Sequence, residues 1–185
     1  MPGNGKRIFS AFAATGLTIA LLLAGQYTWH KTQIEKPLTM GFKQVGAVKD
    51  WDIQYDPDKT KVSVTLKGKA DLQETYLALT GVLDKTLGAG KYNLEVRNNP
   101  SRKLADFYQR IQPVLYEGLS TGRYTWLVRE IDAEAKKDGL EARVQFDHRL
   151  LYLQLAEQDQ AMYKLIPREN GGNQVLASGT AGLAN

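Results

Sequence analysis

An uninterrupted apolar segment near the N-terminus constrains this chain more than any other feature. Residues 8–29 carry no charged side chain and are rich in Ile, Leu, Phe and Ala. Because a helix rises about 1.5 Å per residue, about 20 residues cross the ~30 Å hydrocarbon core of a bilayer. We therefore expect residues 8–29 to form one transmembrane anchor, preceded by a short cytoplasmic segment of residues 1–7.

Residues at the two ends of this segment indicate its orientation. Lys6 and Arg7 precede it, and Tyr27 and Trp29 lie where an aromatic belt belongs. The positive-inside rule then puts the N-terminus in the cytoplasm and the remaining chain on the outer side of the cell membrane. A cleaved signal peptide is the alternative. The apolar segment exceeds the ~7–15 residues of a signal-peptide core, which favours an uncleaved anchor.

Charge and cysteine content limit the classes of partner and cofactor. Without Lys6 and Arg7, 22 basic residues face 20 acidic ones, and their signs alternate, as in Arg129-Glu130. Such alternation is typical of a solvated helix face, whereas a nucleic-acid binder gathers its basic residues. The chain has no cysteine, which excludes disulfides, Cys-ligated metals and a thiol nucleophile. We expect no nucleic-acid partner and no cofactor.

The periodicity of apolar residues predicts an α+β domain. Period-two alternation predicts strands at 51–55, 61–67, 92–96 and 142–146, and we expect two further strands at 149–155 and 160–166. Helical spacing predicts helices over 72–87, from 98–101 to a kink or end near Gln112 caused by Pro113, and over 123–137. The order ββαβααβββ favours a mixed or antiparallel sheet of about six strands with helices on one face. Because residues 149–155 are apolar on both faces, we expect that strand to be central.

The segments around this domain have different compositions. Pro37, Gly41 and Gly46 are expected to interrupt any helix, so we assign residues 30–50 to a stalk. The folded, extracytoplasmic domain then spans residues 51–167. Residues 168–185, which are mostly small or polar, are expected to form a disordered tail.

A β-α-β pattern inside the domain resembles known envelope modules. Strand 61–67, helix 72–87 and strand 91–97 resemble in order and length the small modules called BON domains. They also resemble the ring-building modules of sporulation membrane proteins. The resemblance covers a fifth of the chain, rests on pattern rather than on a motif, and transfers no functional residue.

Histidine, aspartate and glycine residues, which often serve in catalytic or binding sites, occur here at positions that suit turns and helix caps. His148 follows Asp147 in a two-residue turn, where adjacent side chains point apart and no nucleophile is near in sequence. Asp56, Asp58 and Asp71 lack the spacing of a calcium loop and suit turns and helix caps. Residues 88–90 are glycine-rich but follow a helix, as a C-terminal cap does. We therefore predict no catalytic, metal or cofactor-binding residue.

Aromatic residues are concentrated between residues 107 and 126. They surround Pro113, Gly118 and Gly122, which we expect to loosen the helical backbone. Such a cluster can pack in the core or form a groove for a peptide, a glycan or a partner helix. The candidate interaction groove consists of Phe107, Tyr108, Tyr116, Tyr124 and Trp126, with Arg123 and Arg129 at its rim.

These features predict a membrane-anchored, extracytoplasmic interaction or scaffold module of the cell envelope, without catalytic chemistry. Its partner would be another envelope protein or a second copy. One alternative is a membrane-anchored receptor or hydrolase that uses the groove in 107–126. A hydrolase would need Asp106, Glu117, Glu130 or His148 to gather in one cleft. The other alternative is a transmembrane signalling partner.

Overall fold

The computed structural model describes residues 34–56, 58–68 and 70–168, and the predicted anchor 8–29 lies outside these ranges. The described chain is α+β, with six strands in two three-stranded sheets and four helices. None of these helices has both the length and the apolar character needed to cross a bilayer. The elements are α2 (Lys36–Gln44), β1 (Val48–Gln54), β2 (Thr60–Leu66), α3 (Leu72–Thr86), β3 (Tyr92–Val96), α4 (Arg102–Thr121), α5 (Tyr124–Lys137), β4 (Glu141–Phe146), β5 (Leu150–Glu157) and β6 (Gln160–Pro167).

The first sheet has the order β1-β2-β3. Strands β1 and β2 form the predicted antiparallel hairpin, in which Ile53 lies opposite Val62. Helix α3 crosses over and returns the chain to β3, which runs parallel to β2. The N-terminus of α3 is capped as predicted, because the Asp71 side chain accepts a 3.0 Å hydrogen bond from the Glu74 backbone N–H.

Helix α2 corrects the prediction for residues 30–50. Pro37 lies in the first turn of α2, where its missing N–H costs nothing. Gly41 lies within the helix against Val82, whose side chain occupies the space that a Cβ would need. Leu38 and Phe42 are fully buried in the first core. Residues 36–50 therefore belong to the folded domain, and the expected stalk is wrong over this range.

The second sheet is an antiparallel meander in the order β4-β5-β6. Its central strand β5 is buried on both faces, as predicted. Leu151, Leu153 and Leu155 face the second core, which α4 and α5 cover. Leu150 and Tyr152 point the other way, into the first core with α3. Strand β5 thus contributes to both cores.

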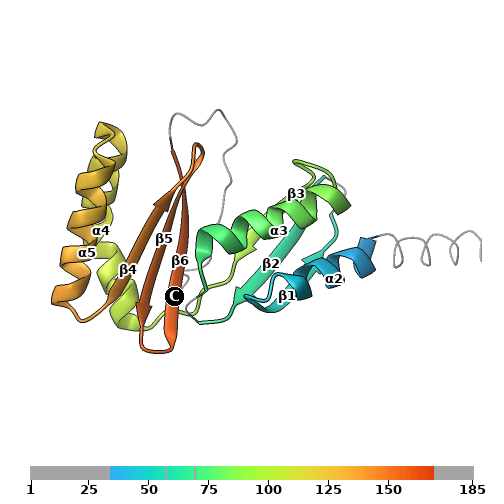
Figure 1. The fold of residues 1–185 in the computed structure, drawn as a ribbon, viewed down its shortest axis with the longest axis horizontal. Coiled ribbons are helices and arrows are strands. Elements are labelled where there is room, and N and C mark those ends of the chain that lie inside the picture. The colour runs from blue at the N-terminus through green and yellow to red at the C-terminus, as the bar shows by residue number, and fades with distance from the viewer. Residues whose placement is uncertain (1–33, 57, 69, 169–185) are drawn as a thin grey trace, which may run out of the picture.

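The prediction of one sheet with helices on one face is wrong. Helices α4 and α5 lie on one side of β4-β5-β6 and α3 lies on the other, while α2 and α3 cover the first sheet (Figure 1). No backbone ladder joins β3 to β6 in the described chain. Instead, the Asn98 side chain donates to the Tyr163 carbonyl (2.9 Å) and accepts from the Tyr163 N–H (2.6 Å).

Helix α4 is longer than predicted. Pro113 lies inside it, and of the two expected outcomes, a kink or an end near Gln112, the end is wrong because the helix continues to Thr121. Residues on both sides of the proline are buried, including Ile111 and Leu115, and this packing outweighs the roughly 3 kcal/mol that an internal proline costs. The break comes at Gly122, whose φ of 67° ends α4 in the left-handed conformation.

Acid should weaken the link between α3 and β4. Asp71 accepts hydrogen bonds from the Glu74 N–H, from Gln145 (3.1 Å) and from Arg143 (3.0 Å), and these contacts lower the pKa of its carboxyl group. Because the unfolded chain binds this proton more tightly, the contribution is complete above about pH 3.9 and is lost as pH falls through the folded pKa. We expect Asp71→Asn, which keeps the helix cap, to flatten the loss of unfolding free energy between pH 4 and 2. Parallel profiles for the two proteins would contradict this.

Candidate functional site

The residues of the predicted aromatic groove do not share one site, because some are buried in the core and others lie at the surface. Phe107 is buried in the second core and cannot contact a ligand. Tyr108 is half-buried, whereas Tyr116 is 65% exposed. Because Tyr108, Gln112 and Tyr116 follow at intervals of four residues, they form one stripe along α4.

This stripe borders a shallow hollow between α4 and β6, which we call the α4–β6 hollow. Its volume is about 160 Å³, and its lining comprises Tyr108, Gln112, Leu115, Tyr116, Leu119, Leu165, Ile166 and Pro167. The Lys164 ammonium group lies 4.9 Å from the centre of the Tyr108 ring, close enough for a cation–π contact. Burial raises the pKa of the Tyr108 hydroxyl above its ordinary value.

The remaining predicted groove residues lie outside the lining of this hollow. The Tyr124 ring packs on Phe146 at 5.0 Å and under the Arg168 guanidinium at 4.5 Å. Arg168, assigned from sequence to the disordered tail, is therefore fixed against the domain. Trp126 is covered by Arg123, which also pairs with Glu117.

Arg129 is exposed on α5. The structure thus brings Tyr108 and Tyr116 together in one hollow, and it distributes the other groove residues over α5 and the second core.

Two of the carboxylates considered for hydrolysis, Asp106 and Glu117, lie at separate positions on α4. Asp106 pairs with Arg102 at 3.8 Å, and Glu117 pairs with Arg123. Eleven residues separate these two acids along α4, which corresponds to about 16 Å. Within the ranges that the structure describes, no group of His, Asp and Glu could hold a metal ion.

Asp147 is occupied by the turn in which it lies. Its carboxylate accepts hydrogen bonds from the backbone N–H groups of Arg149 and Leu150, both at 2.7 Å, and from the Tyr152 hydroxyl at 2.6 Å. Burial alone would raise the pKa of Asp147, but these hydrogen bonds outweigh it and lower the pKa. Asp147 therefore shapes the β4–β5 turn, and His148 beside it is exposed.

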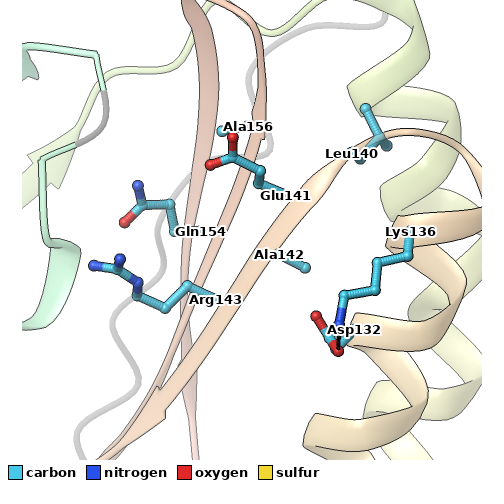
Figure 2. Close-up of a pocket in the computed structure, with 8 residues that line it drawn as sticks. All are labelled: Asp132, Lys136, Leu140, Glu141, Ala142, Arg143, Gln154 and Ala156. Atoms are coloured by element: carbon cyan, nitrogen blue, oxygen red, sulfur yellow. Dashed lines mark hydrogen bonds and ion pairs between the residues drawn. The ribbon is translucent and has the colours of Figure 1, made fainter.

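A second hollow, of about 370 Å³, lies along β4 (Figure 2). Asp132 and Lys136 of α5 border it on one side of the strand, and Arg143 and Gln154 border it on the other. Gln154 is only 6% exposed, and its Oε1 has no hydrogen-bond partner among the described residues. Sequence reasoning missed this hollow, because it depends on which strand lies at the sheet edge.

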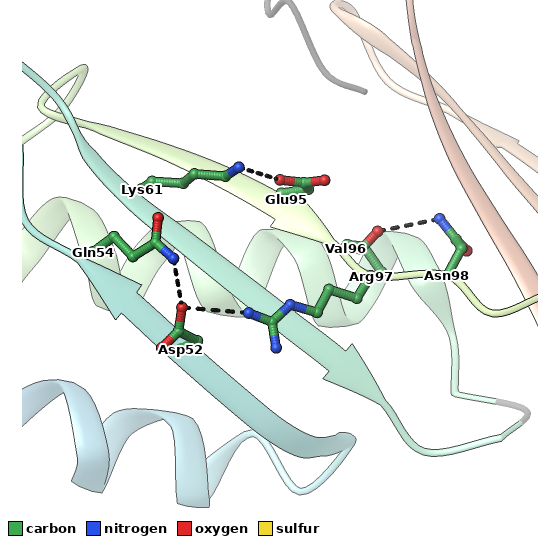
Figure 3. Close-up of polar contacts among 7 residues, drawn as sticks. All are labelled: Asp52, Gln54, Lys61, Glu95, Val96, Arg97 and Asn98. Carbon is green, nitrogen blue, oxygen red and sulfur yellow. Dashed lines mark hydrogen bonds and ion pairs between the residues drawn. The ribbon is translucent and has the colours of Figure 1, made fainter. Parts of the chain in front are cut away.

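The outer face of the first sheet is polar and largely neutralised (Figure 3). Asp52 accepts from Gln54 (3.2 Å) and pairs with Arg97 (3.3 Å), while Lys61 pairs with Glu95 (3.3 Å). These side chains remain about a third to a half exposed, so each pair contributes at most about 1 kcal/mol. The pattern is that of a solvated sheet face.

Comparison of this chain with models of protein families, with curated proteins and with solved structures finds no match.

Proposed function

We propose that this chain is a membrane-anchored, extracytoplasmic interaction module of the cell envelope that binds another envelope protein and has no catalytic chemistry of its own. The observation that carries the proposal is the α4–β6 hollow, with Tyr116 exposed at its border. Tyrosine combines a large apolar surface with a polar hydroxyl, and it is enriched among the residues that dominate binding energy.

The size of the hollow favours a protein partner over a small ligand. Pockets for small molecules usually enclose about 300–1,000 Å³. At about 160 Å³, the α4–β6 hollow can take one or two side chains. A partner would insert an apolar side chain between Tyr108 and Leu165, while Tyr116 would cover it. At the α4–β6 hollow, this geometry supports an interaction module over a receptor for a small molecule.

The placement of the acids supports an interaction module over a hydrolase. Asp106 and Glu117 pair with different arginines on one helix, and Asp147 is satisfied by its own turn. In a hydrolytic centre, the groups that act as acid, base or nucleophile converge on one reacting atom.

The proposed topology follows from residues 1–29. Residues 8–29 span the membrane, Lys6 and Arg7 stay in the cytoplasm, and the domain lies outside. Since α2 begins at Lys36, the connection from Trp29 can extend at most about 25 Å. The domain would therefore work close to the membrane surface, where an envelope partner is within reach.

A photo-crosslinking amino acid tests this function. We expect it to give a discrete adduct with one membrane-associated protein when it replaces Tyr116 in the full chain in native membranes. The same replacement of Leu77, which is 44% exposed on α3, should give none. Adding Gln112→Lys beside position 116 should abolish the adduct, because the lysine would place a charge in the hollow. Equal labelling from both positions would argue against the proposal.

A further inference from the structure

Strand β4 has an outer edge whose backbone groups are directed away from the sheet. The Asp147 N–H donates to the Leu150 carbonyl at 3.0 Å. Since hydrogen-bonding directions alternate along an antiparallel strand, Glu141, Arg143 and Gln145 direct their backbone groups toward β5. Ala142, Val144 and Phe146 direct theirs outward.

At the Phe146 end of this edge, α3 contributes a hydrogen bond to an outward-directed backbone group. The Phe146 carbonyl accepts a 3.1 Å hydrogen bond from the Gln73 side chain. In the described chain, β4 pairs with no strand other than β5. The 370 Å³ hollow lies along the other half of the strand, around Ala142 (Figure 2). An edge of this kind is a template for pairing with a further strand.

The side chains on this half of β4 have complementary charges. Glu141 and Arg143 point to the same face of the strand, with Ala142 between them on the opposite face. A 180° rotation about an axis that passes beside Ala142, perpendicular to the sheet, exchanges the positions of Glu141 and Arg143. The edge is therefore complementary to a second copy of itself, which is the requirement for a two-fold interface.

We propose that two copies of this chain associate through their β4 edges, antiparallel, with Ala142 at the two-fold axis, so that the two β4-β5-β6 sheets become one six-stranded sheet. The Ala142 backbones of the two copies exchange hydrogen bonds. Each Glu141 lies directly opposite the Arg143 of the other copy, in a non-hydrogen-bonded pair whose Cα atoms are about 4.5 Å apart. Opposite charges in such cross-strand positions stabilise the pairing.

Neighbouring registers are less favourable. With Arg143 at the axis, two arginines would lie directly opposite each other, which is destabilising. With Val144 at the axis, Ala142 would have to pair with Phe146, whose carbonyl is already bound by Gln73. With Ala142 at the axis, opposite charges face each other, and the outward-directed backbone groups can pair without breaking the hydrogen bond between Gln73 and Phe146.

Helix α5, which packs beside β4, also carries an acid and a base that are complementary to those of a second copy. Asp132 and Lys136, one turn apart, border the hollow and are joined by a 2.6 Å contact. The two-fold rotation sets α5 antiparallel to its copy, which brings the acid of one helix toward the base of the other.

This interface differs from the α4–β6 hollow, and it would hold even if that hollow bound nothing. Charged residues on an edge strand can also prevent pairing with another chain. The experiment therefore asks whether two copies associate through β4 or whether the charges on β4 keep them apart. Because the chain contains no cysteine, a single introduced cysteine reports on one position alone.

The test is oxidative cross-linking of the full chain in native membranes. We expect Ala142→Cys to form a disulfide-linked dimer, since Cα atoms about 5.5 Å apart lie within the range of a disulfide. Val144→Cys should stay monomeric, because the proposed register separates the two Val144 positions by about 13 Å. Absence of the Ala142→Cys dimer, or equal cross-linking at both positions, would overturn the proposal.

Charge reversal tests the register independently. Arg143→Glu places acids opposite each other and should reduce the Ala142→Cys dimer at least fivefold. Adding Glu141→Arg restores opposite charges and should recover the dimer, although the ion pair between residue 143 and Asp71 within one chain remains broken. If the double variant fails to recover it, the proposed pairing is wrong. Cross-linking from position 116 to an envelope protein should be the same in all these variants.

Discussion

Replacing Tyr152 with alanine should cost about 3–5 kcal/mol of unfolding free energy, as truncation of a buried aromatic residue usually does. Tyr152 is 1% exposed, and its ring packs edge-on against Tyr76 of α3 at 5.8 Å. It lies on β5 next to Leu151 and Leu153, which belong to the other core. Since domains are stable by roughly 5–15 kcal/mol, this loss could unfold a large fraction of the protein.

The conservative variant separates packing from hydrogen bonding. Tyr152→Phe keeps the ring and removes the hydroxyl that donates to Asp147, so we expect a loss of about 1–2 kcal/mol. Denaturant unfolding of the purified chain in detergent measures both variants. If Tyr152→Ala cost no more than Tyr152→Phe, the contact between α3 and β5 would not be a main link between the two cores.

Glycine-to-alanine substitutions in two helices should have opposite effects on stability. A Cβ at Gly118 would lie 2.8 Å from the Cβ of Leu127 and 2.9 Å from both of its methyl groups. Leu127 is fully buried, and its Cβ cannot move without moving α5. We expect Gly118→Ala to separate α4 from α5 and to destabilise the protein by about 1–3 kcal/mol.

Gly81 provides the matched control in the middle of α3. A Cβ there meets no atom within 4 Å. Gly81→Ala should therefore gain about 0.5–1 kcal/mol from helix propensity alone. Thermal unfolding of both variants in parallel measures the difference. A stabilising Gly118→Ala would show that the two helices do not need their close approach.

Local features of the sequence predicted most of the secondary structure. The spacing of leucines and the cap at Asp71 predicted α3, because both signals act within the helix itself. Apolar residues on both faces correctly predicted a central position for β5. By contrast, Pro37 and Gly41 were interpreted as helix breakers. Proline is compatible with the first turn of α2, and Val82 packs where Gly41 has no side chain.

The features that depend on contacts between distant segments could not be predicted. Period-two alternation shows which residues share a face of a strand, but it does not identify the neighbouring strand. The structure has two separate sheets, and between them the Asn98 side chain hydrogen-bonds to the Tyr163 backbone of β6. The edge position of β4 follows from the strand order β4-β5-β6, which alternation also does not reveal.

Two residues of the predicted groove are neighbours in the structure. Tyr108 and Tyr116 share a stripe because their spacing within α4 is local, and the structure places both at one hollow. Tyr124 and Trp126 are close to them in sequence only. The chain reverses at Gly122, and α5 then directs Tyr124 to Phe146 and Trp126 to Arg123. Whether the hollow binds an envelope protein stays a prediction.

We propose that the domain lies outside the cell membrane on an uncleaved anchor, and labelling of a single thiol from outside the cell tests this topology. Asp159 is exposed in the turn between β5 and β6, so Asp159→Cys gives an accessible thiol in a chain with no other cysteine. We expect a membrane-impermeant maleimide to label this variant in intact cells, at full-length mobility and in the membrane fraction. Labelling only after lysis would contradict this topology, and so would a shortened chain that leaves the membrane.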